Sequence, residues 1–311
     1  MFTKTFKEIN SKNVDIAGGK GASLGEMTQA GLAVPPGFVV LAPGFDKFLE
    51  ETDLNVEVAA ALKQADPKDI KSVEDTSVKI RDLIWDAEFP ADIAEEVKKS
   101  FKELGAELVA VRSSATAEDS SIASWAGELE TYLNVTEENL LESVKKCWSS
   151  LFTPRAIFYR YEKNLHERHV SVAVVVQGMV QSEVSGICFT VHPVTEDREQ
   201  MVIEAGYGLG EAIVGGMITP DTYVINKTDW VILDANISKQ EKMITRTDKG
   251  AEERPVDEGK QEKQKFSNER IIELAKLCAH IEEHYAKPQD IEWAYEGGKL
   301  YITQSRPITT L

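Results

Sequence analysis

The segment that most constrains the fold of this chain is a pair of alternating stretches joined by two glycines, over residues 290–306. Apolar residues recur at every second position on both sides of Gly297-Gly298, a pattern that is typical of a β-hairpin. Glu292, Gln304 and Arg306 lie near the ends of the two arms, away from the turn. Carboxylate and amide oxygens suit a hard cation such as Mg²⁺, and an arginine side chain suits phosphate. The segment therefore predicts a metal and phosphate site on a hairpin.

The length of the turn decides whether the two metal-ligand candidates share a face of this hairpin. A two-residue turn pairs Glu292 with Thr303 and places Gln304 on the opposite face. A three-residue loop over 296–298, with Gly298 in the left-handed conformation, shifts the pairing by one residue. We predict the three-residue loop, because it is the register that lets Glu292 and Gln304 bind one Mg²⁺.

Composition restricts the possible functions. The chain has 311 residues, enough for one large or two ordinary domains, and its net charge is −17. This charge argues against broad, unspecific binding of nucleic acid. The three cysteines are widely spaced and form no CxxC pair, which is typical of a reduced cytoplasmic protein. The N-terminus has no apolar signal core, and the longest apolar run, 170–180, is too short to span a membrane.

The order of helix-like and strand-like segments predicts an α+β protein with two lobes. Charged amphipathic helices are expected within residues 45–104, a helix from residue 137 that Thr136 caps, and a last helix to residue 285 that Ser267 caps. The expected strands of the second half cover residues 170–176, 186–191, 201–205, 222–226 and 230–234. A hinge is expected near 177–180, which divides the chain into lobes of residues 1–178 and 179–311.

Two segments of the first lobe carry a cation next to small residues. Lys20 stands among Gly18, Gly19 and Gly21, where it could reach phosphate while backbone amides approach it closely. The spacing does not match a P-loop, and a flexible turn before a helix explains this segment at least as well. Arg112 follows a buried strand and precedes a run of small residues, which suits either phosphate binding or a loop that caps a helix.

Two further glycine-containing segments have a similar ambiguity. Over residues 125–134, Gly127 could fold the backbone over phosphates and Thr131 could donate a hydrogen bond, although an ordinary surface hairpin is also consistent. The glycines of residues 204–211 do not match the dinucleotide-binding fingerprint. A loop beside a ligand and simple close packing both remain open there.

Taken in order, these segments resemble the N-terminal nucleotide-binding domain shared by phosphoenolpyruvate synthase, pyruvate phosphate dikinase and rifampicin phosphotransferase. The resemblance covers about residues 12–309 and is nearest to the phosphoenolpyruvate synthase form. The segments that carry it are GGKGASLG (18–25), VRSSATAED (111–119), AGELETYLN (126–134), VVVQGMV (174–180), SGICFTVHPVT (185–195), GLGE (208–211), DIE (290–292) and QSRP (304–307).

The resemblance implies an ATP-grasp fold that binds ATP and Mg²⁺ in a cleft between two lobes. The positions that match the family's ligand-binding residues form four groups: phosphate contacts and catalysis at Lys20, Arg112 and Arg306; the loop over the phosphates at Gly127 and Thr131; the hinge that faces adenine at Gln177, Met179 and Val180; and Mg²⁺ ligands at Glu292 and Gln304. Two departures stand out, because relatives often have a basic residue at Gly178 and Gln-Gln at Glu128-Leu129.

The resemblance also implies a partner that receives the phosphoryl group. In this family ATP phosphorylates a histidine on a swivelling carrier domain, which serves a pyruvate-binding or other acceptor domain. None of the five histidines here lies in a Thr-Ser-His context, so we expect carrier and acceptor on another chain or a missing part of this one. The implied first half-reaction belongs to the conversion of pyruvate, ATP and water to phosphoenolpyruvate, AMP and phosphate. The alternatives are the ATP-binding part of a rifampicin phosphotransferase-like enzyme and a non-catalytic nucleotide-binding regulatory partner.

Overall fold

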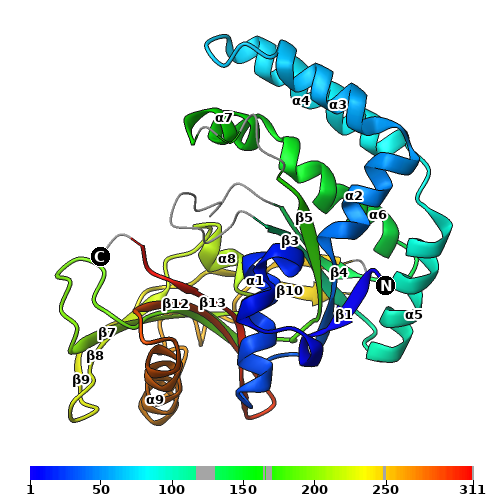
Figure 1. Ribbon diagram of the computed structural model, residues 1–311. Coiled ribbons are helices and arrows are strands. Elements are labelled where there is room, and N and C mark those ends of the chain that lie inside the picture. Colours follow the sequence, from blue (N-terminus) through cyan, green and yellow to red (C-terminus); the bar gives the residue numbers. More distant parts are fainter. Residues whose placement is uncertain (117–129, 164, 166–169, 248–249, 310–311) are drawn as a thin grey trace. The chain divides into compact units, whose positions relative to one another are not determined.

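The computed structural model describes residues 1–116, 130–163, 165, 170–247 and 250–309 (Figure 1). The chain forms two compact units, Met1–Gly31 with Pro36–Met179, and Leu32–Pro35 with Val180–Leu311. Each unit combines a β-sheet with helices, which confirms the expected α+β class. The units divide between Met179 and Val180, within the segment expected to be a hinge.

The first unit is built on a five-stranded antiparallel sheet in the order β1-β2-β5-β3-β4. Its central strand is a run of valines that is buried on both faces, as the apolar stretch at residues 170–176 predicts. The bounds of the five strands are Thr3–Thr5 (β1), Gly37–Val40 (β2), Val109–Ala115 (β3), Thr131–Val135 (β4) and Val172–Gly178 (β5).

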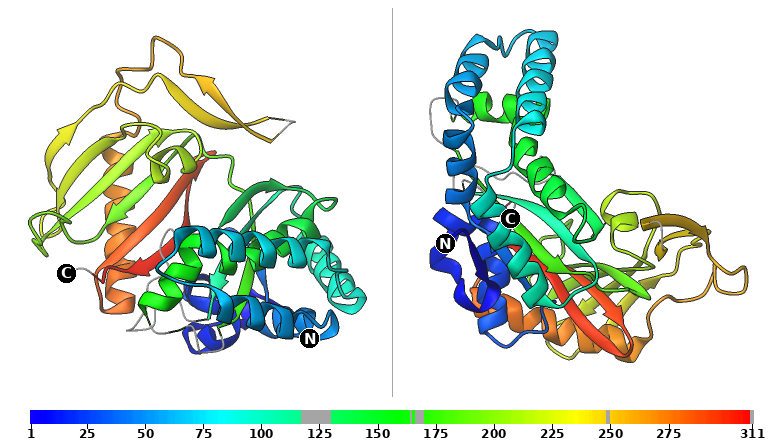
Figure 2. Two further views of the ribbon diagram at one scale, coloured as in Figure 1. Left: turned by 90° about the horizontal axis from the view of Figure 1, so that it is seen from above. Right: turned by 90° about the vertical axis from the view of Figure 1, so that its right-hand side faces the viewer.

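Helices cover both faces of this sheet. Helix α1 packs on one face, against β3 and β5, and α2 and α6 pack on the other (Figure 1). Helices α3 and α4 lie side by side beyond them (Figure 2). None of the helices in the described ranges is both long and apolar enough to cross a membrane. The helices of this unit are Val14–Gln29 (α1), Ala42–Glu51 (α2), Leu54–Gln64 (α3), Ile70–Asp86 (α4), Ala91–Leu104 (α5), Leu140–Ser149 (α6) and Pro154–Glu162 (α7), with short 3₁₀ turns at Phe6–Glu8, Ser11–Asn13 and Ser150–Phe152.

The amphipathic stripes of the sequence form the core of this unit. Ile80 and Ile84 of α4 are fully buried, as are Ile93 and Val97 of α5, and these helices contribute to one cluster with the aromatic side chains around Trp148. The predicted start of α6 was wrong. The backbone amide of Thr136 donates to Asn139 Oδ1 at 2.7 Å, so this threonine opens a turn, and the helix begins at Leu140.

The second unit contains a six-stranded antiparallel sheet in the order β13-β12-β6-β7-β8-β9 and a separate two-stranded ribbon, β10-β11. Helix α9 packs on one face of the large sheet, against β7 and β12 (Figure 1). Ser267 caps this helix, since its side chain accepts a hydrogen bond from the backbone amide of Arg270, as predicted. The elements are Val184–Phe189 (β6), Gln200–Tyr207 (β7), Glu211–Val214 (α8), Asp221–Asn226 (β8), Ile232–Asn236 (β9), Lys242–Thr247 (β10), Gly250–Pro255 (β11), Asn268–Tyr285 (α9), Gln289–Glu296 (β12) and Lys299–Pro307 (β13).

The turn of the β12-β13 hairpin differs from the prediction. Glu296 pairs with Lys299, so the loop contains two residues, Gly297 and Gly298, with φ of 57° and 85°. Positive φ at both positions is the requirement of a tight hairpin turn, and glycine meets it without a steric penalty. The predicted three-residue loop is therefore wrong.

Candidate functional site

Lys20 lies directly after a kink in α1. Gly18 interrupts the helix with φ 66° and ψ 173°. A Cβ at Gly18 would lie 2.3 Å from the carbonyl oxygen of Ser114, so β3 and this turn are in backbone contact. Ser114 Oγ donates to the carbonyl of Ala17 at 2.9 Å and accepts from the amide of Gly21 at 3.2 Å. The glycines of this segment thus fix the turn of Lys20 against β3.

Arg112, Thr131 and Gln177 come from three neighbouring strands and project from one face of the sheet. Arg112 lies directly opposite Thr131 on β4, and side chains of opposite residues share a face. Gln177 on β5 lies opposite Ala110, two residues before Arg112 and therefore on the same face. Ser114, which contacts the Lys20 turn, lies two residues beyond Arg112. The first unit therefore gathers three candidate ligand-binding residues on one sheet face, and α1, which carries Lys20, covers that face in part.

Gln177 carries a buried polar group that lacks a partner. Its side chain is 3% exposed, and its Nε2 has no hydrogen-bond acceptor among the residues that the structure describes. Met179 and Val180 follow, and the amide of Met179 donates to the carbonyl of Leu108 at 3.1 Å. A buried donor without an acceptor costs free energy unless a ligand or water supplies one. Gly127, the remaining candidate in this unit, lies outside the described residues.

Glu292 and Gln304 lie directly opposite each other on β12 and β13. The two-residue turn on its own would have paired Glu292 with Thr303. An irregularity between Glu292 and Trp293 shifts the register by one residue, so that Thr303 is the extra residue of a β-bulge. The sharing of a face that the sequence predicted is present, but a bulge produces it and the turn does not.

Arg306 forms an ion pair with Asp290 on the same face. Asp290 lies opposite Arg306, and its Oδ2 accepts from Nε at 2.8 Å and from Nη2 at 2.6 Å. Burial raises the pKa of Asp290 above its usual range, and the neighbouring Glu292 adds to this rise. The Arg306 guanidinium opposes the rise only in part. The pair fixes one edge of the guanidinium next to Glu292 and Gln304.

Glu204 is a candidate that sequence reasoning did not select. Across the sheet, Glu292 lies opposite Ile187 on β6, which lies opposite Glu204 on β7, so both carboxylates project from one face. Burial, together with the charge of Asp290, raises the pKa of Glu204. Its carboxylate forms no hydrogen bond or ion pair with another residue in the described part of the chain. A signal was present in the sequence, since Glu204 is the one charged residue within the apolar run 201–205.

The opposite face of this sheet is apolar and packs against α9. The side chain of Cys188 on β6 contacts Cys278 on α9, and the ring of Trp293 lies 5.1 Å from that of Phe266. The acidic face is therefore the one directed away from α9. No three His, Cys, Asp or Glu side chains in the described ranges are close enough to hold a metal unaided. A cation on the acidic face would therefore draw on oxygens of other kinds, for which the Gln304 amide oxygen opposite Glu292 is a candidate.

Comparison with known proteins assigns the chain to a family. The family model described as "Pyruvate phosphate dikinase, AMP/ATP-binding domain" matches residues 14–311. This chain belongs to that family. The match covers both units and every candidate residue discussed above, so the chain is an AMP/ATP-binding domain of the dikinase type.

Named relatives are longer than this chain. A probable phosphoenolpyruvate synthase of Methanocaldococcus jannaschii is 47% identical over 100% of this chain and 27% of its own length. The phosphoenolpyruvate synthase of Pyrococcus furiosus is 43% identical over 100% of this chain and 44% of its length. The rifampicin phosphotransferase of Bacillus subtilis is 39% identical over 98% of this chain and 35% of its length. The chain thus spans less than half of each of these relatives.

Proposed function

We propose that this chain binds ATP with Mg²⁺ and transfers a phosphoryl group from ATP to a histidine of a separate carrier domain, as in phosphoenolpyruvate synthase. The observation that carries this proposal is the pairing of Glu292 with Gln304 beside the Asp290–Arg306 ion pair, in a member of an AMP/ATP-binding family. A metal-ligand pair and an arginine on one sheet face are the parts that phosphoryl transfer needs. We propose that the domain has the ATP-grasp fold.

The chemistry relies on positioning and charge neutralisation. Mg²⁺ commonly takes one or two protein oxygens and completes its shell with water and substrate phosphates. Glu292 and Gln304 would supply those protein oxygens. Arg306 would neutralise the charge of the phosphoryl group in transfer, and Lys20 and Arg112 would contact the phosphate chain. In this scheme no side chain of the domain has to form a covalent intermediate.

The first unit supplies candidate contacts for the rest of the nucleotide. The orphaned Nε2 of Gln177 would donate to an acceptor of the adenine ring, with Met179 and Val180 completing that edge of the site. Thr131, opposite Arg112, would donate to a phosphate oxygen, and Gly127 belongs to the segment proposed to cover the phosphates. These assignments follow the family positions, and the shared face of Arg112, Thr131 and Gln177 supports them.

The overall reaction we propose is that of the synthase relatives, from pyruvate, ATP and water to phosphoenolpyruvate, AMP and phosphate. The carrier histidine and the pyruvate-binding domain would lie outside the 311 residues. Identity to the synthases, 47% and 43%, exceeds the 39% identity to the rifampicin phosphotransferase, which favours pyruvate over an antibiotic as the final acceptor. We also propose that the protein acts in the cytoplasm.

Transfer of a labelled phosphoryl group tests the proposal. ATP labelled at the β-phosphoryl group is incubated with this chain, Mg²⁺ and a separately supplied Thr-Ser-His carrier domain. The expected products are acid-labile phosphohistidine on the carrier, which holds the β-phosphoryl group, AMP, and the γ-phosphate released to water as orthophosphate. Carrier labelling and AMP release should both be lost without Mg²⁺ or in Glu292→Ala. If ATP binds but no carrier domain tested becomes labelled, the regulatory alternative replaces this proposal.

A further inference from the structure

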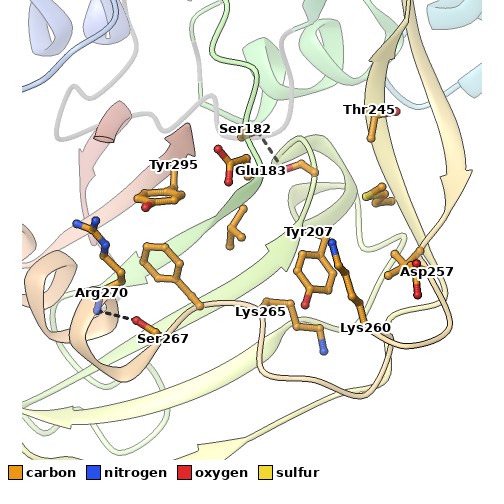
Figure 3. A pocket seen from close by; sticks show the side chains of 15 residues that line it. Ser182, Glu183, Tyr207, Thr245, Asp257, Lys260, Lys265, Ser267, Arg270 and Tyr295 are labelled. Atoms are coloured by element: carbon orange, nitrogen blue, oxygen red, sulfur yellow. Dashed lines mark hydrogen bonds between the residues drawn. The ribbon is translucent and has the colours of Figure 1, made fainter. Parts of the chain in front are cut away.

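The second unit contains a cavity of about 600 Å³ that the proposed function does not use. The sheet end, the start of β10 and the segment that leads into α9 line it (Figure 3). Tyr295, Val184 and Tyr207 of the lining lie on the same sheet face as Trp293, because they occupy matching register positions on β12, β6 and β7. The cavity is therefore on the α9 face, opposite to the face that carries Glu292 and Gln304.

Aromatic rings form part of the lining of this cavity. Tyr207, Phe266 and Tyr295 all line it, and the ring centroids of Phe266 and Tyr295 are 5.1 Å apart. Val184, Met243 and Val256 add apolar surface. Three rings around a space of this volume, within the ~300–1,000 Å³ of typical ligand sites, favour a small planar aromatic molecule.

The basic side chains that line the cavity differ in whether they already form an ion pair within the protein. Lys265 is fully buried and pairs with Asp221 at 2.8 Å, and Arg270 pairs with Glu273 at 2.6 Å. Lys260, by contrast, forms no ion pair or side-chain hydrogen bond with any residue in the described ranges. Lys260 is therefore the cation of this cavity that a ligand can engage without displacing a protein partner.

The acids of the lining are less suited to a cationic ligand. Glu183 Oε1 accepts from the amide of Gly297 at 2.8 Å, and Asp257 Oδ1 accepts from the amide of Gly259 at 2.8 Å. Their charges are thus partly compensated by backbone donors. Figure 3 shows Arg270 on the Tyr295 side of the cavity and Lys260 on the Tyr207 side, so an anion in the cavity has positive charge on two sides.

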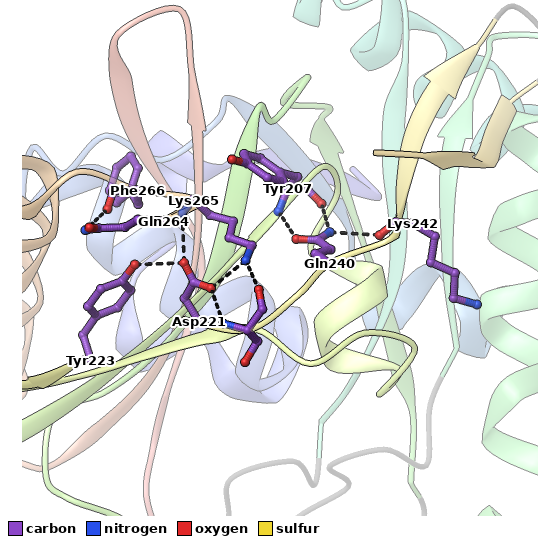
Figure 4. Close-up of polar contacts among 9 residues, drawn as sticks. Tyr207, Asp221, Tyr223, Gln240, Lys242, Gln264, Lys265 and Phe266 are labelled. Atoms are coloured by element: carbon purple, nitrogen blue, oxygen red, sulfur yellow. Dashed lines mark hydrogen bonds and ion pairs between the residues drawn. The ribbon is translucent and has the colours of Figure 1, made fainter. Parts of the chain in front are cut away.

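The walls of the cavity are fixed before any ligand arrives. Asp221 accepts from the backbone amide of Lys265 at 2.9 Å and from the hydroxyl of Tyr223 at 3.0 Å, which ties the segment before α9 to β8 (Figure 4). The side-chain oxygen of Gln240 accepts a hydrogen bond from the amide of Tyr207 at 2.8 Å, and its Nε2 donates to the carbonyl of Tyr207 at 3.0 Å. A preformed site loses less conformational entropy on binding.

We propose that this cavity binds a small aromatic anion, with the aromatic ring against Tyr207, Phe266 and Tyr295 and its phosphate or carboxylate group on Lys260. The site is separate from the proposed nucleotide site, since it lies on the other face of the sheet. It gives the domain a second ligand class that does not depend on phosphoryl transfer.

Phenyl phosphate is the probe that tests this site, with phenol and inorganic phosphate as its two halves. Titration calorimetry and saturation-transfer NMR are done in the Arg112→Ala background, which removes a candidate phosphate contact of the proposed nucleotide site. Phenyl phosphate should bind saturably, and each half should bind at least about tenfold more weakly, because ring burial and the charged contact both contribute.

Two lysines of one loop make the decisive comparison. Lys260→Met keeps the aliphatic stem and should weaken phenyl phosphate binding by about fivefold or more, whereas Lys263→Met, three residues away and outside the lining, should leave it unchanged. Tyr207→Leu should weaken both phenyl phosphate and phenol. Equal affinity of Lys260→Met and Lys263→Met, or no saturation at concentrations on the order of 10 mM, overturns the proposal. ATP binding of Lys260→Met should equal that of the unaltered chain, so failure here and failure of the proposed function remain distinguishable.

Discussion

The two candidate faces, one in each unit, reach a similar arrangement by different routes. In the first unit, Arg112, Thr131 and Gln177 lie on regular strand register, so the simple alternation of side chains places them together. In the second unit, regular pairing from the turn would place Thr303 opposite Glu292, and a β-bulge at Thr303 shifts the pairing by one residue so that Gln304 lies there instead. In a regular strand, alternation alone decides which side chains share a face. A single extra residue in one strand moves every later side chain of that strand to the opposite face.

The largest effect is expected from substitution of Arg306, and the rate of phosphoryl transfer in the variant shows whether the face of the second unit takes part in the reaction. Arg306→Ala should lower phosphoryl transfer to a carrier histidine by on the order of 10³-fold, because it removes the guanidinium expected to neutralise the transferring group. The rate is measured by transfer of the labelled β-phosphoryl group under single-turnover conditions. Arg306→Lys keeps the charge but loses the planar fork and should recover only part of the rate. Unaltered transfer in both variants would remove Arg306 from the catalytic set.

Substitution of Gly18 tests whether the close backbone contact between α1 and β3 stabilises the first unit. Gly18→Ala should lower the free energy of unfolding by about 3 kcal/mol or more, since a Cβ would be 2.3 Å from the Ser114 carbonyl oxygen in a left-handed backbone conformation. Urea unfolding followed by circular dichroism gives the value.

Gly31 is the matched control for that substitution. It also has positive φ, at 78°, but a Cβ added there would meet no atom within 4 Å from elsewhere in the described part of the chain. Gly31→Ala should therefore cost only about 1 kcal/mol, which is the backbone penalty alone. Equal losses at Gly18 and Gly31 would mean that the contact with β3 contributes nothing to the fold.

Deletion of Thr303 tests what the bulge contributes to the second face. Because Ile302 still pairs with Trp293 and Gln304 with Glu292 after the deletion, the shared face should survive without the bulge. We expect the affinity for Mg²⁺-ATP to change by less than about tenfold, through altered local twist alone. Isothermal titration measures it. An alanine inserted after Thr303 is the counterpart. With the bulge kept, the alanine lies opposite Glu292 and Gln304 moves opposite Ile291, on the other face, which should abolish the Mg²⁺ dependence of binding.

The smallest effect is expected from substitution of Glu204. Its pKa is raised in the folded protein, so its ionised form is less favourable there than in the unfolded chain at neutral pH. Glu204→Gln should therefore raise Tm at pH 7 by a few degrees at most. The advantage should shrink as pH falls through the raised pKa, because the native carboxyl group then becomes protonated. Melting curves of the variant and of the unaltered chain, recorded from pH 7 downwards, measure this difference. A lower Tm of the variant at pH 7 would contradict the interpretation.

Most of the local structure could be predicted from the sequence. The valine run became β5, the Ser267 cap began α9, and the stripes of Ile80–Ile84 and Ile93–Val97 became the core of the first unit, since each depends on periodicity or a cap within a few residues. The start of α6 could not be read this way, because the Asn139 side chain binds the amide of Thr136 and turns the chain before the helix begins.

The candidate site shows where such local reasoning ends. By itself the sequence determined which residue types were available, that Gly297-Gly298 turns a hairpin, and that the ordered motifs belong to an AMP/ATP-binding family. Tertiary structure alone decided that Glu204 lies on the face of Glu292, that Asp290 pairs with Arg306, and that a bulge sets the register between β12 and β13. The reason is physical: strand order and register depend on packing against partners distant in the chain, and no local pattern encodes which strand becomes the neighbour.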